Sequence, residues 1–260
     1  MRSDRGRIAS FIILLVVLGF IMKIPSEVIH ELVGHGAFVV VFGGVILEIR
    51  ISLLWPYELS GILFDFPGGI SEVQLALVMS GGIVACLVVS LALQIVLSLK
   101  RSKYLWLESS LFWLAFWCLM NSTGYLIIGG LAPFGDIWWL IGHGFIDPIL
   151  SVAIGIFFFL IGFWLLSNIL RRNLARIMPD NRVRLGTTIF WFIIPLIVVF
   201  TTLGWGSIRF EYLAISFIPV LLSWLVESQL KRKKRNNKKE SLIEDVREVA
   251  SEEDIGNGSI

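Results

Sequence analysis

Long runs of apolar residues, separated by short polar or glycine-rich stretches, dominate the chain. A helix needs roughly 20 apolar residues to cross the hydrocarbon core of a bilayer, and runs approaching or exceeding this length recur along most of the sequence. We therefore predict an all-α polytopic membrane protein with about six transmembrane helices. The candidate spans are Ile8–Met22, Val73–Leu99, Leu105–Gly130, Pro148–Leu170, Thr187–Gly204 and Tyr212–Val226.

Basic residues gather near the ends of these runs and give the expected orientation. Of the 22 Lys and Arg residues, 19 lie in four segments, namely 2–7, 100–103, 171–184 and 231–260. Cytoplasmic loops carry an excess of Lys and Arg, so all four segments and both termini are expected in the cytoplasm. The prediction is a multi-pass protein of the cell membrane, with an integral membrane domain over 1–230 and a partly disordered polybasic and acidic tail over 231–260.

The composition excludes a water-soluble globule. Apolar residues make up 56% of the chain and charged residues 16%, against about 45–50% and about 25% in soluble domains. The net charge of +2 arises from segregated charges and gives no indication of a nucleic-acid partner. Cys86 and Cys118 lie in apolar runs without ligand spacing, so they predict neither a disulfide framework nor a zinc knuckle.

The residues between the first two spans do not fit the apolar pattern, because glycine, proline, histidine and charged side chains interrupt them. Ser26 is a suitable N-cap, and the following residues predict a helix from Val28 to Phe42. The segment 45–52 has the composition of a short strand. Because both ends of this region are expected on the outer side, we predict a re-entrant or partly inserted helix that carries His30, Glu31 and His35.

Ionisable groups inside apolar sequence are costly, at least ~2.5–3.5 kcal/mol at the centre of a membrane helix, so each predicts a partner or a task. His30-Glu31 and His35 form His-Glu-x-x-x-His. This is one residue longer than the zincin pattern His-Glu-x-x-His, whose histidines bind zinc and whose glutamate is the general base. Residues five apart are separated by about 140° on a regular α-helix, which is unfavourable for one metal.

Two arrangements would resolve this spacing. A π-bulge brings positions five apart into register, and such bulges are frequent at functional sites. Alternatively, Glu31 and His35 are the ligands, His30 supports them from outside the ligand set, and Glu27 lies one turn before Glu31. A third interpretation needs no metal at all, since membrane helices also use polar side chains for interhelical hydrogen bonds.

A second polar segment, Asn121–Asp136, is rich in glycine and contains Pro133, which predicts an unwound helix end. Asp136 then begins a new apolar helix, and a regular helix would place Asp136, His143 and Asp147, at seven- and eleven-residue spacing, near one face. His143 lies seven residues later and is a candidate accessory group, although a membrane-interface position beside the neighbouring tryptophans is the commoner explanation. This segment also starts on the expected outer side, so it can meet the helix that carries His30.

These residues resemble the site-2 protease family of intramembrane zinc metalloproteases. The likeness covers roughly residues 8–170, and it rests on a His-Glu helix, a following strand-like segment and a later aspartate in a Pro/Gly-rich segment. The resemblance implies that His30, His35 and Asp136 bind Zn²⁺ and that Glu31 is the catalytic base. Asn121 is a candidate accessory residue that would orient the substrate or stabilise the oxyanion. Two departures are the extra residue before His35 and the absence of a Leu-Asp-Gly form around Asp136.

The predicted function is therefore a zinc metallopeptidase that hydrolyses peptide bonds of membrane-associated substrates. Its expected partners are the lipid bilayer and a membrane-protein or peptide substrate, with no nucleic acid. One alternative is a zinc-dependent hydrolase of lipid amides or esters. Another is a non-catalytic membrane protein, either a degenerate protease relative or an ion or proton conductor, which the five-residue histidine separation favours.

Overall fold

The computed structural model describes residues 4–52, 60–132, 135–179 and 182–191, and the single positions Leu221, Leu225, Ser228 and Gln229. The first part of the chain is helical and leads into a hairpin: α1 (Asp4–Ile21), α2 (Lys23–Val28), the π-helix η1 (Ile29–Gly36), α3 (Ala37–Val41), β1 (Val45–Arg50) and β2 (Gly61–Asp65). The rest is α4 (Glu72–Leu99), α5 (Leu105–Leu131), α6 (Gly135–Gly142) and α7 (Pro148–Leu174); residues 182–191 are also helical.

Four helical segments in the described part of the chain are long and apolar enough to cross a membrane: Ile8–Val41, α4, α5 and α7. This is compatible with a multi-pass membrane protein. The last two predicted spans, Thr187–Gly204 and Tyr212–Val226, lie almost entirely outside the described residues, as does the predicted tail over 231–260. The prediction of six spans is therefore not confirmed.

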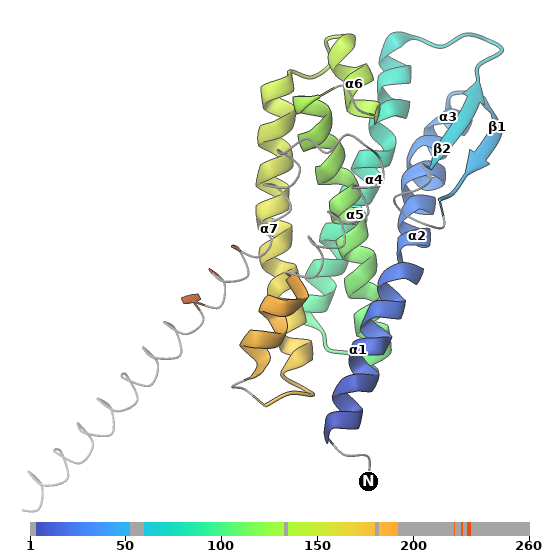
Figure 1. Ribbon diagram of the computed structural model, residues 1–260. Helices are drawn as coiled ribbons and strands as arrows, with labels where there is room; N and C mark the ends of the chain where they lie inside the picture. Colours follow the sequence, from blue (N-terminus) through green and yellow to red (C-terminus); the bar gives the residue numbers. More distant parts are fainter. Residues whose placement is uncertain are drawn as a thin grey trace, which may run out of the picture.

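The prediction of a separate re-entrant helix was wrong. The histidine-bearing segment continues the first span, so that α1, α2, η1 and α3 follow one another up the same side of the bundle (Figure 1). Ser26 does not cap a new helix, because its hydroxyl donates to the Lys23 carbonyl at 2.7 Å inside α2. Pro25 falls in the first turn of α2, where a helix tolerates its missing N–H.

The predicted strand is present as β1, and the sequence analysis did not predict its partner. β1 and β2 pair antiparallel from Val45 opposite Asp65 to Arg50 opposite Gly61, with an irregularity between Ile46 and Glu48. Side chains of β1 are mostly exposed. The hairpin therefore lies at the edge of the helical bundle, beside α3 (Figure 1).

The three long helices α4, α5 and α7 run side by side in alternating directions, and α6 closes the end of the bundle opposite the N-terminus (Figure 1). Helix α5 remains regular through Leu131, so the predicted unwinding after Asn121 does not occur within it. The main core is aromatic, with Phe112, Trp113 and Phe116 of α5 packed near Phe163 and Trp191. Apolar side chains on the outer faces of α1, α4 and α7 are exposed, as expected of surfaces that meet lipid.

Candidate metal centre

The π-helix η1 brings the two histidines of the long motif together. It covers Ile29–Gly36, eight residues rather than the single bulge that the spacing required. The His30 and His35 rings meet edge to face with their centroids 4.9 Å apart, and their Nε2 atoms are separated by 3.3 Å. The π-helical interpretation of the five-residue spacing is therefore confirmed.

Asp136, at the start of α6, completes the cluster. Its Oδ2 atom lies 3.3 Å from His30 Nε2 and 3.2 Å from His35 Nε2. Both histidines are almost fully buried, and 17% of the aspartate side chain is exposed. Among the described residues, these three form the one group of histidine, cysteine and acidic side chains placed to hold a metal ion.

The spacing of the three donor atoms suits a tetrahedral ion. Zn–N and Zn–O distances near 2.0–2.2 Å place neighbouring tetrahedral ligands about 3.3–3.5 Å apart. The three observed separations are 3.2–3.3 Å, so the donors form a nearly equilateral triangle of the required size. If these groups held a tetrahedral ion, three protein ligands would leave a fourth position for water or substrate, as in catalytic rather than structural zinc sites.

The hydrogen bond of His35 directs its second ring nitrogen at the other two donor atoms of the cluster. The Val78 carbonyl can only accept a hydrogen bond, so His35 Nδ1, 2.7 Å away, donates to it. In the neutral imidazole, Nε2 then carries a lone pair, and that lone pair faces His30 Nε2 and the Asp136 carboxylate. Converging acceptor groups repel unless a proton or a metal ion lies between them.

Three residues on one face of α4 contact the two histidines. Val78, Gly82 and Cys86 follow one another at four-residue spacing, which places them on one helix face. Cys86 is buried, and its Sγ lies 3.9 Å from His30 Nδ1. The Gly82 backbone lies against both rings, because a Cβ there would be 2.6 Å from His35 Nε2. These contacts fix the orientation of the imidazoles, as is typical around metal ligands.

Tyr125 of α5 packs against His30. Its ring lies over His30 with the centroids 4.9 Å apart and the planes tilted by 31°. Gly135 has a φ of +56°, and a Cβ at this position would be 2.4 Å from the tyrosine ring. A glycine is therefore needed immediately before Asp136, both for the backbone conformation and for the approach of Tyr125.

The environment of Asp136 favours its ionised form. Burial raises the pKa of this carboxyl group, but the hydrogen bonds with His30 and His35 outweigh burial and lower it to about 2. The group therefore offers an anionic oxygen at neutral pH. An anionic oxygen beside two imidazole nitrogens is a ligand set that suits zinc.

Glu31, the predicted base, is buried next to His30 in η1. Its carboxylate does not belong to the group of donor atoms that meet around Asp136. The alternative in which Glu31 replaces His30 as a ligand therefore finds no support in the geometry.

The predicted accessory residues Asn121 and Glu27 do not belong to the group of donor atoms. Asn121 Nδ2 donates to Glu27 Oε1 at 3.4 Å, and Glu27 pairs with the buried Lys23 at 3.3 Å. Lys23 also donates to the Ser52 hydroxyl at 3.3 Å. These contacts join α2 and α5 to the end of the hairpin, so they stabilise the packing around the site.

His143 is not part of the cluster. It is exposed just after α6, stacks on Trp139 with the ring centroids 4.0 Å apart, and its Nδ1 lies 2.9 Å from the Trp139 carbonyl. The predicted common face of Asp136, His143 and Asp147 does not form, because α6 ends at Gly142 and Asp147 caps α7. The interfacial interpretation of His143 fits this position better.

Tyr125, Gly82 and Cys86 contact the candidate metal ligands but were not predicted from the sequence to belong to the site. The four-residue spacing of Val78, Gly82 and Cys86 was a visible signal, but nothing in the sequence connects that face to the histidines. Comparison of the chain with protein-family models, with curated proteins and with solved structures finds no match. The function proposed for this protein is therefore inferred from its own candidate site.

Proposed function

We propose that the protein is an intramembrane zinc metalloprotease, similar in its chemistry to the site-2 protease family, that hydrolyses peptide bonds of membrane-associated substrates. The observation that carries the proposal is the triangle of His30 Nε2, His35 Nε2 and Asp136 Oδ2, with separations of 3.2–3.3 Å, beside the buried Glu31. Two histidines and an acidic ligand with an adjacent glutamate are the parts of a hydrolytic zinc site.

Each residue then has a separate task. His30, His35 and Asp136 would hold Zn²⁺, which when bound supplies Lewis acidity and activates water near neutral pH. Glu31 accepts the proton of the attacking water and returns it to the amine of the leaving peptide. The Val78 carbonyl, Cys86 and Tyr125 keep the imidazoles in place through their contacts with the two rings.

The hairpin supplies a surface on which the substrate can be extended. A helix in lipid hides its carbonyls in internal hydrogen bonds, so its backbone must unwind before hydrolysis. β1 pairs with β2 along one edge, and in the described part of the chain no strand pairs with its other edge. An extended substrate would add to that edge through main-chain hydrogen bonds.

The test is cleavage of a tagged membrane protein by purified protein in liposomes with added zinc. Glu31→Gln should abolish cleavage while retaining zinc, because the donor triangle is intact. Glu72→Gln makes the same chemical change at an exposed position in the first turn of α4 and should cleave as the wild type does. Equal cleavage by wild type and Glu31→Gln would refute the proposed role of Glu31.

Two further measurements separate the alternatives. Zinc-dependent release of fatty acid from lipid amides or esters, without peptide cleavage, would replace the protease with a lipid hydrolase, whose bond cleavage requires the same centre. A preparation that contains no zinc and acquires none on titration would remove both enzymes. The protein would then be a non-catalytic membrane protein with a polar cluster.

A further inference from the structure

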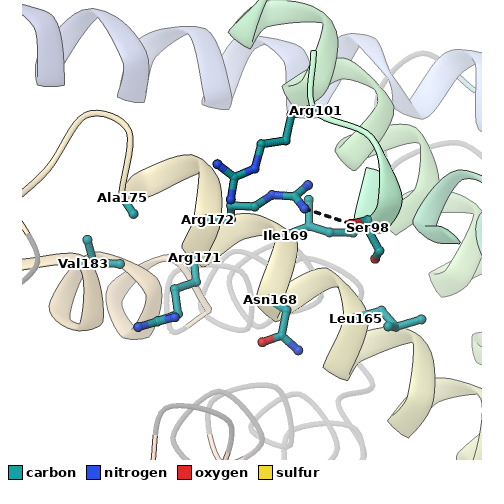
Figure 2. A pocket seen from close by; sticks show the side chains of 9 residues that line it. All are labelled: Ser98, Arg101, Leu165, Asn168, Ile169, Arg171, Arg172, Ala175 and Val183. Atoms are coloured by element: carbon teal, nitrogen blue, oxygen red, sulfur yellow. Dashed lines mark hydrogen bonds between the residues drawn. The ribbon is translucent and has the colours of Figure 1, made fainter. Parts of the chain in front are cut away.

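A cavity of about 550 Å³ lies at the end of the bundle where α4 and α7 finish (Figure 2). This volume is within the range of about 300–1,000 Å³ that is typical of small-molecule sites. The cavity is separate from the metal centre, since none of its lining residues touches the donor triangle. It is lined by Ser98, Arg101, Leu165, Asn168, Ile169, Arg171, Arg172, Ala175 and Val183.

The lining is strongly basic. It includes three arginines and no acidic side chain. The nearest carboxylate shown by the contacts, Glu108, is already engaged by Arg172 at 3.1 Å and by Arg176 at 2.7 Å. Among the described residues, Arg172 and Arg176 share this one carboxylate and Arg101 adds a further exposed positive charge, so a ligand that fills the cavity should be an anion.

Arg172 is held in place before any ligand binds. Its Nη1 donates to the Ser98 carbonyl at 3.2 Å, and its Nη2 donates to the Leu97 carbonyl and to Glu108. These contacts attach the end of α7 to the last turn of α4. Arg101, by contrast, is an exposed side chain that reaches into the cavity from the chain just beyond α4 (Figure 2).

The position of the cavity suits the headgroup region of a bilayer. It lies where two membrane-spanning helices end, at Leu99 and Leu174. Leu165, Ile169 and Val183 give it apolar walls. On α7, exposed apolar side chains continue from the cavity toward the middle of the helix, namely Trp164, Ile161, Leu160 and Phe157.

We propose that this cavity binds the phosphate of an anionic phospholipid, with the acyl chains lying along the exposed apolar face of α7. Arginine guanidinium groups bind phosphate oxygens with good geometry and strength. Basic pockets between membrane helices on the cytoplasmic side bind anionic headgroups, and the basic segments 100–103 and 171–184 mark this end as the cytoplasmic one. The site is independent of the proposed protease activity.

The test measures lipid binding to the purified full-length chain in detergent by native mass spectrometry, with phosphatidylglycerol, phosphatidylcholine and inorganic phosphate as separate probes. Phosphatidylglycerol should bind preferentially. Arg101→Gln should weaken it at least about tenfold, because it removes a charge-assisted hydrogen bond to the phosphate and not only a charge near the lipid surface. Lys103→Gln removes the same charge from the same loop, outside the lining, and should change binding less than twofold.

Arg172 is left unchanged in these variants, because its loss would leave the buried Glu108 with one fewer partner. Equal binding of the two lipids by the wild type would overturn the proposal. So would equal effects of Arg101→Gln and Lys103→Gln, because only the overall charge would then matter. Arginine-dependent binding of inorganic phosphate without lipid preference would show a free-anion site instead of a lipid site.

Discussion

Substitution of Gly82 by alanine tests the metal centre without removing any ligand. A Cβ on Gly82 would lie 2.6 Å from His35 Nε2 and 2.7 Å from His30 Nε2. An ordinary van der Waals contact begins near 3.4 Å, so the imidazoles must move by about 0.8 Å or α4 must move away. Metal–ligand distances tolerate only about ±0.2 Å. The donor triangle would therefore lose its fit to a single ion.

We expect the zinc affinity of Gly82→Ala to fall by at least about 100-fold. Changes to residues that only support a ligand typically cost about 10–100-fold, and here the added methyl group displaces two ligands directly. The folded state should lose about 1–3 kcal/mol for overpacking, partly offset by the better helix propensity of alanine. The assay is competition for zinc against a chelator of known affinity, alongside thermal unfolding of the metal-free protein.

Gly124→Ala is the matched control. Gly124 lies in α5, another membrane-spanning helix, and a Cβ there would meet no atom within 4 Å. This variant should bind zinc as the wild type does. Wild-type zinc affinity in Gly82→Ala would refute the reasoning, because the contact between α4 and the imidazoles would then have no part in metal binding.

Three other substitutions have expected outcomes. Asp136→Asn removes the anionic ligand and should lower zinc affinity by more than about 100-fold in the same competition assay; unchanged affinity would exclude this aspartate as a ligand. Cys86→Ala removes the sulfur near His30 and should lower affinity by up to about tenfold; wild-type affinity would show that this sulfur does not support His30. Glu108→Gln leaves two partly buried arginines without their carboxylate and should destabilise the fold by about 3 kcal/mol, lowering the thermal midpoint without changing zinc affinity.

The sequence predicted the elements whose pattern is local. Long apolar runs gave α4, α5 and α7 with bounds close to those observed, and the β-rich segment 45–52 appears as β1. The helix boundary at Ser26 was wrong because capping propensity is a weak local signal. In the folded chain the Ser26 hydroxyl is satisfied within α2, and packing against α5 carries the helix through Pro25 into η1.

The candidate site was predictable only in part. The His-Glu motif and the later aspartate identified the three donors, since few ionisable groups occur inside apolar sequence. Tyr125, Gly82 and Cys86 were not identified, because their relevance depends on which faces of α4 and α5 meet η1. His143 and Asp147 were placed near the site by assuming a regular helix past Gly142, where α6 in fact ends.

The five-residue histidine spacing, Gly34 in the motif and the adjacent glycines Gly81 and Gly82 of α4 have one structural explanation. The extra residue in the histidine motif requires a π-helix, and that helix contains Gly34. A Cβ on Gly34 would lie 2.4 Å from the Gly82 Cα, and a Cβ on Gly81 would lie 2.6 Å from the Gly34 carbonyl oxygen. Small residues permit such close contact between membrane helices. The same contact that lets η1 pack against α4 brings Val78 within hydrogen-bonding distance of His35. The π-helix and the glycines of α4 therefore depend on each other for close packing. Deleting Val33 would restore the shorter His-Glu-x-x-His spacing. This deletion should disrupt the packing and lower zinc affinity, even though it recreates the common motif.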